Sequence, residues 1–322
     1  MAHEIILAKG KLQTNITNAC SNITWSSHID ALGVELSFDM ARGAYSVETG
    51  DQLILLSNKQ PLNYFVVVTT SRDGQNNLTV TAFDRAWYLN KNETIIQFKK
   101  ASASDAIGKL LDKFGVKHRI AKMNTLIKKI YKDQTVSDII LDILDQVRQE
   151  TGQQHRMEMD KDTLVIERQS ELLINPYIKL SGNTYSFPIA KTVSNPSVER
   201  SIEDMKNNVI VVADGDDRTK VYTTLQDASS IAKYGLLTEV VTVDDKNRAQ
   251  ARNIAKTTLT ELNKVNESVS CELLGHDDVR AGRTIELNEP NIEMVGKYLI
   301  MSASHTISNG IHKVAVELKG VR

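Results

Sequence analysis

The chain has 322 residues, of which 41% are hydrophobic and 25% are charged. This balance is typical of folded proteins, and the length predicts two or three domains at about 100–200 residues each. The 39 Lys and Arg residues nearly cancel the 40 Asp and Glu residues, giving a formal net charge of -1. Such a chain has no net field to attract nucleic acid or an anionic membrane, so we expect neither as a partner.

Signals for export and for disulfide bonds are missing from the sequence. Residues 1–15 lack the basic start and long apolar stretch of a signal peptide. No window approaches the roughly 18 consecutive apolar residues of a membrane-spanning helix. Cys20 and Cys271 are the two cysteines and lie far apart, which favours free thiols in a reduced compartment. We therefore expect synthesis in the bacterial cytoplasm.

Residues 1–100 show the pattern of β-strands. Apolar and polar residues alternate in short runs, and turn signals such as Arg72-Asp73-Gly74-Gln75 separate the runs. Short strands of this kind, separated by turn signals, predict a small antiparallel barrel or sandwich. The expected strands are residues 34–38, 51–56, 64–70 and 77–83.

Residues 101–185 predict a small α+β domain with an internal duplication. Ser102 and Asp105 form a capping-box pattern before an apolar helical face that ends at Gly115. Thr135 and Asp138 repeat this pattern before a second apolar helix. A hairpin with strands at 156–159 and 163–168 is expected to complete the second unit.

Residues 186–322 return to strands and predict a second barrel with an associated helix. Strands at 209–213 and 220–225 flank the turn signal Asp214-Gly215, and a helix is expected from about 245 to 264. The final expected strands are residues 283–287, 298–304 and 312–318. The whole chain is thus predicted to be α+β and β-rich, with parts at 1–100, 101–185 and 186–322.

The two strand-rich ends follow a similar order. A Gly turn and three strands lie at 47–50, 53–55, 64–68 and 78–81, and again at 279–282, 284–287, 298–301 and 314–317. This similarity predicts a structural repeat. Because the strands of any antiparallel barrel show this alternation, the sequence alone leaves open whether the two ends are a structural repeat or only share a generic pattern.

Several short segments resemble one protein family. They are Gly50-Asp51-Gln52-Leu53, the run from Thr79 to Asn92 that contains Asp84, Tyr234-Gly235, Gly282, Gly296-Lys297-Tyr298, His305 and Gly310-Ile311-His312. Together they resemble the hub proteins (late control protein D-like) in the baseplates of contractile phage tails and phage-tail-like bacteriocins of Gram-positive hosts. The resemblance implies two barrels related to the tail-tube fold in one chain. The candidate assembly residues are Gly50, Asp51, Asp84, Gly282, Gly296 and Tyr298.

The same resemblance implies a structural role in a tail baseplate. Three chains with two barrels each present six barrels, which lets a homotrimer join a sixfold tube to a threefold spike. The implied partners are the tail tube protein, the central spike protein and other baseplate proteins. No catalytic residue, cofactor or metal is implied, so we expect a protein that is not an enzyme and that is assembled into a phage tail or tail-like particle.

Catalytic alternatives find little support. The seven His residues show no HExxH and no metal-ligand spacing, although His305 and His312 flank a predicted turn and can be neighbours across a hairpin. Phosphate loops and a Gly-x-Ser-x-Gly elbow are missing. A peptidoglycan hydrolase with two carboxylates, or a sugar-binding tail component, remains the alternative. Its candidate acids, all in turn-like or helix-start contexts, are Asp204, Asp214, Asp216, Asp217, Asp244 and Asp245.

Overall fold

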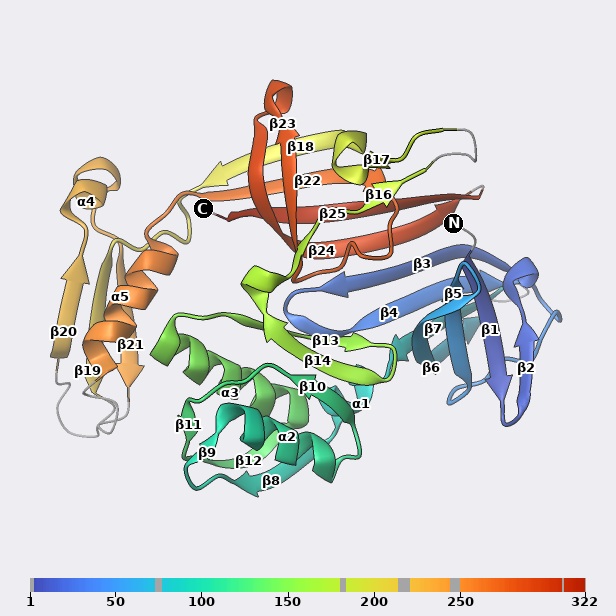
Figure 1. The fold of residues 1–322 in the computed structure, drawn as a ribbon, viewed down its shortest axis with the longest axis horizontal. Helices are drawn as coiled ribbons and strands as arrows, with labels where there is room; N and C mark the ends of the chain where they lie inside the picture. Colours follow the sequence, from blue (N-terminus) through green and yellow to red (C-terminus); the bar gives the residue numbers. More distant parts are fainter. Residues whose placement is uncertain are drawn as a thin grey trace. The chain divides into compact units, whose positions relative to one another are not determined.

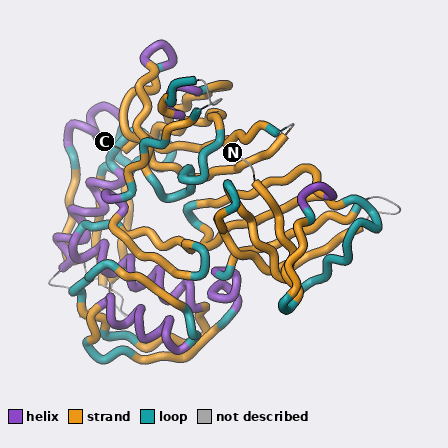
Figure 2. Tube along the Cα trace, turned by 45° about the vertical axis from the view of Figure 1, so that its right-hand side comes forward, coloured by secondary structure: helices purple, strands orange, loops and turns teal. Residues whose placement is uncertain are grey.

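A computed structural model describes residues 3–72, 77–179, 184–213, 221–243, 250–308 and 310–321. Two compact units make up the chain. The first contains Met1–Ile143, His155–Val198 and Val269–Arg322, and the second contains Leu144–Gln154 and Glu199–Ser268. Strands carry most of the described chain (Figure 2). Within the described ranges, no helix has both the length and the apolar character needed to cross a membrane.

One large sheet of 13 strands dominates the first unit (Figure 1). Its main path runs in the order β18 (Ser194–Ser201), β22 (Asn266–Leu274), β25 (Ile311–Val321), β24 (Met294–Ser308), β3 (Cys20–His28), β4 (Ala31–Met40), β7 (Leu78–Asp84), β6 (Gln60–Arg72), β5 (Gln52–Ser57), β1 (His3–Lys9) and β2 (Leu12–Asn15). β23 (Thr284–Glu289) pairs with β24, and β15 (Leu173–Ile174) pairs with β23. The predicted strand-rich ends are confirmed.

The predicted strand-rich α+β class with antiparallel strands is confirmed, but the strands do not form closed barrels, because the N-terminal and C-terminal strands share one open sheet. β24 pairs with β23 through Met294 to Leu299 and then with β3 through Ser302 to Ile307. A register shift between Ile300 and Ser302 lies at this change of partner. β24 is long enough to pair with β23 along its first half and with β3 along its second half. The two groups of strands are therefore continuous with each other, and neither closes into a barrel. In Figure 1 the blue strand β3 lies beside the red strand β24.

Among the described residues, two apolar clusters pack against the large sheet, one for each group of strands. Alternation places one side of each strand inside, as in β5, where Leu53 and Leu55 are fully buried. The N-terminal cluster includes Leu36, Phe38, Leu53, Leu55, Phe65, Val67, Val80 and Ala82. The C-terminal cluster includes Val269, Leu273, Val279, Ile285, Leu287, Tyr298, Ile300, Val314, Val316 and Leu318.

The inserted segment contains both predicted helices. Its elements are α1 (Ala86–Lys91), β8 (Glu93–Gln97), β9 (Ala101–Ser102), α2 (Ala103–Lys113), β10 (Lys117–Ile120), β11 (Leu126–Ile127), β12 (Ile130–Thr135), α3 (Val136–Thr151), β13 (His155–Asp160) and β14 (Thr163–Arg168). The strand pairs are β8–β12, β9–β11 and β10–β14–β13, and the β13–β14 pair is the predicted hairpin. Further on, β16 (Tyr177–Ile178) pairs with β17 (Phe187–Pro188).

The two predicted helix starts have the same hydrogen bonds. Ser102 Oγ accepts the Asp105 amide at 3.2 Å and donates to Asp105 Oδ2 at 2.6 Å. Thr135 Oγ1 accepts the Asp138 amide at 3.2 Å and donates to Asp138 Oδ2 at 2.6 Å. A side-chain oxygen thus satisfies one otherwise unpaired amide at each helix start. This geometry confirms the matched capping patterns of the insert.

The second unit has its own three-stranded sheet. β19 (Asn208–Ala213) pairs antiparallel with β20 (Val221–Gln226) and parallel with β21 (Thr238–Val243). The β19–β20 pairing confirms the predicted hairpin, whose turn, with Asp214, Gly215, Asp216 and Asp217, lies outside the described residues. α4 (Ala228–Tyr234) precedes β21, and α5 (Ala251–Leu262) is the predicted helix, although residues 244–249 are not among those described. Its core contains Val209, Val211, Val243, Ala251, Ile254 and Ala255.

Candidate functional site

The predicted repeat appears as two sets of three antiparallel strands. We call β5–β6–β7 the N-terminal repeat and β23–β24–β25 the C-terminal repeat. In the first, Leu53 faces Phe65; in the second, Ile285 faces Tyr298. The next pairs also correspond, because Val67 faces Ala82 and Ile300 faces Leu318. Both central strands then shift register, between Val67 and Thr69 and between Ile300 and Ser302. The common register confirms that the two ends share a strand pattern.

Gly50 and Gly282 open the two repeats with the same backbone geometry. The Gly50 amide donates to Val67 O at 2.8 Å, and the Gly282 amide donates to Ile300 O at 2.8 Å. Their φ angles are +92° and +87°, a region that residues with a side chain rarely adopt. A Cβ on Gly50 would meet no heavy atom within 4 Å, whereas one on Gly282 would lie 2.3 Å from Nε of Arg156. Only Gly282 therefore also makes room for a neighbouring element.

The residue after each Gly carries opposite charge in the two repeats. Asp51 Oδ2 accepts the Glu48 amide at 2.9 Å and lies 3.0 Å from Lys9 Nζ on β1. Arg283 instead donates to Glu158 Oε1 on β13 at 2.7 Å. Burial acts to raise the pKa of Glu158, but the charge and hydrogen bond of Arg283, together with the charges of Arg280 and Arg156, hold that pKa below its usual range. The residue after the Gly thus links each repeat to a different element: Asp51 links the N-terminal repeat to β1, and Arg283 links the C-terminal repeat to the β13–β14 hairpin.

Asp84 is a fully buried carboxylate that joins β4 to the start of α1. Its Oδ2 accepts the Val34 amide at 3.0 Å and its Oδ1 accepts the Ala86 amide at 3.0 Å. Burial raises the pKa of Asp84 to about 7, against the opposing effect of these two backbone donors. Gly33, at φ +116°, allows this approach because a Cβ there would lie 2.9 Å from Asp84 Oδ1. The sequence did not indicate Gly33, whose role depends on a carboxylate far along the chain.

The remaining candidates, Gly296 and Tyr298, have different environments. Gly296 pairs with Leu287 at φ +135°, and a Cβ there would meet no heavy atom within 4 Å. Tyr298 is 2% exposed and fills the C-terminal apolar cluster. The six predicted residues are thus distributed over the two repeats and do not form one cluster of side chains. That any of them contacts a partner stays a prediction.

A buried cluster of histidines lies where the first strand meets the β24–β25 hairpin. His305 Nδ1 and His312 Nε2 are 2.9 Å apart, which confirms that they are neighbours across the hairpin. His305 Nε2 lies 2.7 Å from Val279 O. Because a carbonyl oxygen only accepts, His305 must carry its proton on Nε2. Burial lowers the pKa of His305 to about 4 and that of His312 to about 3, so both rings are neutral near pH 7.

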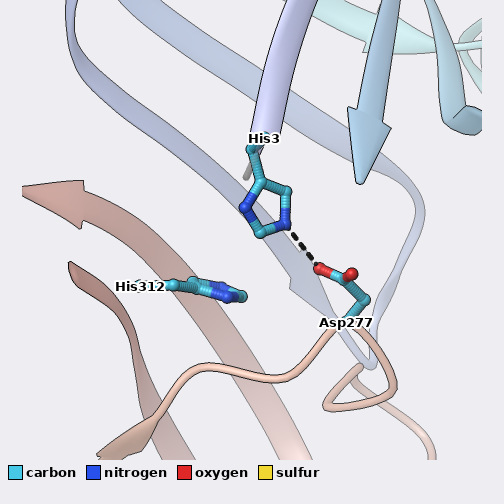
Figure 3. Close-up of side chains that lie close together, drawn as sticks. All are labelled: His3, Asp277 and His312. Carbon is cyan, nitrogen blue, oxygen red and sulfur yellow. Dashed lines mark hydrogen bonds and ion pairs between the residues drawn. The ribbon is translucent and has the colours of Figure 1, made fainter. Parts of the chain in front are cut away.

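Two further side chains complete this cluster (Figure 3). His3 Nε2 lies 2.8 Å from Asp277 Oδ1, and Ser57 Oγ donates to Asp277 Oδ2 at 2.5 Å. Burial acts to raise the pKa of Asp277, but the hydrogen bonds from His3 and Ser57 outweigh it and lower that pKa. The Trp25 ring stacks on His305 with centroids 4.8 Å apart. Sequence spacing could not reveal this cluster, because His3 and Asp277 are 274 positions apart.

A groove of about 740 Å³ lies over β3, β4, β24 and α1. Glu35 is its one carboxylate among the described lining residues, whereas glycoside cleavage in the usual form needs two. Asp204, an earlier candidate acid, is exposed and outside this groove, and Asp214, Asp216, Asp217, Asp244 and Asp245 fall outside the described residues. The groove therefore does not supply the pair of acids that a wall hydrolase would use.

The sequence model of the family described as YQBQ-like matches residues 23–319. The chain belongs to the YQBQ-like family. This YQBQ-like chain is 27% identical over 285 residues to the uncharacterized protein YqbQ of Bacillus subtilis (strain 168), covering 85% of this chain and 82% of the relative. It is 26% identical over 284 residues to the phage-like element PBSX protein XkdQ of the same strain, with the same coverage.

Solved structures of tail proteins share the fold of this YQBQ-like chain. The tail protein from Neisseria meningitidis MC58 has a TM-score of 0.72 at 14% identity, covering 99% of this chain and 97% of its own. The 43 kDa tail protein of prophage MuSo2 from Shewanella oneidensis has a TM-score of 0.71 at 11% identity, and the match covers 99% of this chain and 98% of that protein. The E. coli c3393 protein has a TM-score of 0.55 at 9% identity, and the match covers 94% of this chain and 74% of that protein. It is a type VI secretion component described as structurally similar to the T4 tail proteins gp27 and gp5. The resemblance to phage tail proteins is confirmed.

Proposed function

We propose that this chain is the structural hub of a contractile tail baseplate, a homotrimer that joins a sixfold tail tube to a threefold spike. The observation that carries the proposal is the shared register of the two repeats. Three chains would present six surfaces of the same backbone design, which is what bonding to a sixfold ring requires. Sharing one sheet does not prevent this, because each repeat keeps its own Gly turn and its own apolar cluster.

The comparisons support the same assignment. One relative is named as a phage-like element protein, and the c3393 protein belongs to a secretion system and is described as similar to phage tail proteins. We assign residues 1–100 and 186–322 to the two tube-like parts and residues 101–185 to the insert between them. The partners would be the tail tube protein, the central spike protein and other baseplate proteins, with assembly following synthesis in the bacterial cytoplasm. We assign no catalytic activity and no nucleic-acid partner.

Measurement of mass in solution tests the hub assignment. The purified full chain is examined alone and mixed with the tube and spike proteins of the same tail, because binding of a partner stabilises the assembled ring. We expect three copies per complex and a ring with a threefold or pseudo-sixfold outline in electron micrographs. A stable dimer under both conditions would contradict the trimer. Release of sugar fragments from purified peptidoglycan would favour the hydrolase alternative instead.

A further inference from the structure

The histidine cluster joins three segments that are remote in the chain. His3 lies on the first strand, Asp277 in the loop before the C-terminal repeat, and His312 on β25. One nitrogen or oxygen from each lies within 4.8 Å of the other two. His3 and His312 are 9% and 7% exposed, so the cluster is largely shielded from water. Figure 3 shows the ring of His3 directed at Asp277, with the ring of His312 beside them.

The hydrogen bonds of the cluster leave two ring nitrogens without partners. Since His305 donates to Val279 O, its Nδ1 accepts and His312 Nε2 must donate to it. His312 Nδ1 is then an unprotonated lone pair, and it is buried with no hydrogen-bond partner among the described residues. His3 Nδ1 is likewise buried without a partner in that part of the chain. Unsatisfied buried polar atoms are rare in folded proteins and call for an explanation.

A second layer of contacts holds the three side chains in place. Ser57 Oγ binds the outer carboxylate oxygen of Asp277, and His305 fixes the ring of His312. The backbone at Gly275 lies so close to His312 that a Cβ there would be 2.2 Å from the ring. Outer hydrogen bonds of this kind are typical of metal sites, where they set the orientation and protonation of the ligands.

We propose that His3, Asp277 and His312 bind one divalent transition-metal ion of the zinc class, which ties the first strand to the β24–β25 hairpin. Two imidazoles and one carboxylate suit Zn²⁺, whereas Ca²⁺ and Mg²⁺ take mainly oxygen ligands. Bond lengths of about 2.0–2.2 Å place the ligand atoms of a tetrahedral site about 3.4 Å apart, with a fourth position left for water. Binding therefore requires the side chains to adjust from their present spacing of up to 4.8 Å, and the ion replaces the hydrogen bond between His3 and Asp277. The inference does not depend on the hub assignment.

Metal binding by the full-length chain tests the proposal. After chelator treatment and dialysis, we expect calorimetric titration with Zn²⁺ to give one site per chain and a higher unfolding temperature with the ion. His3→Gln keeps an amide donor for Asp277, and Asp277→Asn keeps an acceptor for His3, so both should fold. Each should weaken Zn²⁺ binding at least tenfold. His28→Gln, at a half-exposed surface ring beside Asp30, should bind as wild type does.

Two results would overturn the site. One is wild-type protein that binds no Zn²⁺ at micromolar concentrations, and the other is His3→Gln and Asp277→Asn proteins that bind like His28→Gln. Circular dichroism without metal checks that each variant is folded. A readout independent of any variant is the visible spectrum of the wild-type Co²⁺ complex. Intense bands of four-coordinate Co²⁺ are expected, whereas the weak spectrum of hydrated, six-coordinate Co²⁺ would contradict the proposal.

Discussion

Gly50 and Gly282 make the same backbone hydrogen bond in two distant parts of the chain. Each amide donates at 2.8 Å to the central strand of its repeat, and the carbonyl of the following residue accepts the return bond at 2.9 Å. The two positions differ only in what lies around them. Gly50 borders open space, whereas Gly282 lies against the side chain of Arg156.

We expect Gly50→Ala and Gly282→Ala to destabilise the protein unequally. Both place a side chain at positive φ, which costs about 1–3 kcal/mol. Gly282→Ala should cost more, because Arg156 must move away from its hydrogen bond to Ile29 O. Urea unfolding of each variant measures the difference. Gly43→Ala, at φ +74° with no heavy atom within 4 Å of the added Cβ, is the control for the backbone cost alone.

The Arg156 contact can be isolated by a double-mutant cycle. Arg156→Ala removes the side chain that a Cβ at position 282 would meet, so Gly282→Ala should cost less in that background. Equal costs in the two backgrounds would show that Arg156 does not constrain this position. Gly50→Ala should cost the same with or without Arg156.

Asp84 should make stability fall as the pH rises from about 4 to about 7. Its native pKa of about 7 lies above the unfolded value of 3.8, so the native state holds the proton more firmly between these values. Stability from this group is greatest below about pH 4 and declines until about pH 7. Asp84→Asn removes this dependence of stability on pH. It should also destabilise the protein at every pH, because the NH₂ group of Asn would face a backbone N–H donor. The stability gap to wild type should thus be wider at pH 5 than at pH 8 in urea unfolding.

A matched variant separates the Asp84 effect from general charge effects. Glu286→Gln removes an exposed carboxylate on β23 and should leave the pH profile of stability unchanged. A gap between wild type and Asp84→Asn that is the same at both pH values would show that Asp84 stays ionised throughout.

The Arg283–Glu158 ion pair should contribute strongly to attaching the insert. Both side chains are nearly buried, with 17% and 16% exposed. Breaking a buried pair leaves one charge uncompensated, so Glu158→Ala or Arg283→Ala should cost about 3 kcal/mol. The double variant should show a coupling energy of about 1–3 kcal/mol in urea unfolding. The exposed pair Lys117–Asp162 should couple by less than about 1 kcal/mol, and similar coupling in the two pairs would refute the prediction.

Both cysteines should be unreactive and dispensable for assembly. Burial raises the pKa of Cys20 to about 12 and that of Cys271 to about 11, so neither is a thiolate near pH 8. Labelling of the folded protein by a thiol reagent should be slow and should accelerate in urea. The Cys20→Ser, Cys271→Ser double variant should assemble normally, with some loss of stability from the C-terminal core. Assembly that depends on an added oxidant would contradict this.

Local patterns predicted the elements well because their causes are local. Alternation indicated the strands at 34–38 and 77–83, which correspond to β4 and β7, and the capping residues Ser102 and Thr135 marked two helix starts. The Gly turns were found because a positive φ restricts the residue type. Each of these signals acts within a few residues, so the sequence shows it directly.

Closure and clustering could not be predicted because they depend on remote pairing. Whether a group of strands closes into a barrel depends on which edge strands pair with each other. The pairing of β24 with β3 has no signal in the local sequence. The His3–Asp277 contact joins the first strand to the C-terminal repeat in the same way. His305 and His312 were foreseen as neighbours only because a single turn separates them.

The pairing of β3 with β24 also sets an order for folding during synthesis. β3 is made near the start of translation, but its partner leaves the ribosome only when the chain is almost complete. Until then β3 presents an unpaired edge, which is prone to bind other chains. Contacts between such distant residues also form slowly. Chains released before residue 302 should therefore aggregate, so a stalled ribosome would yield insoluble fragments instead of a folded N-terminal half.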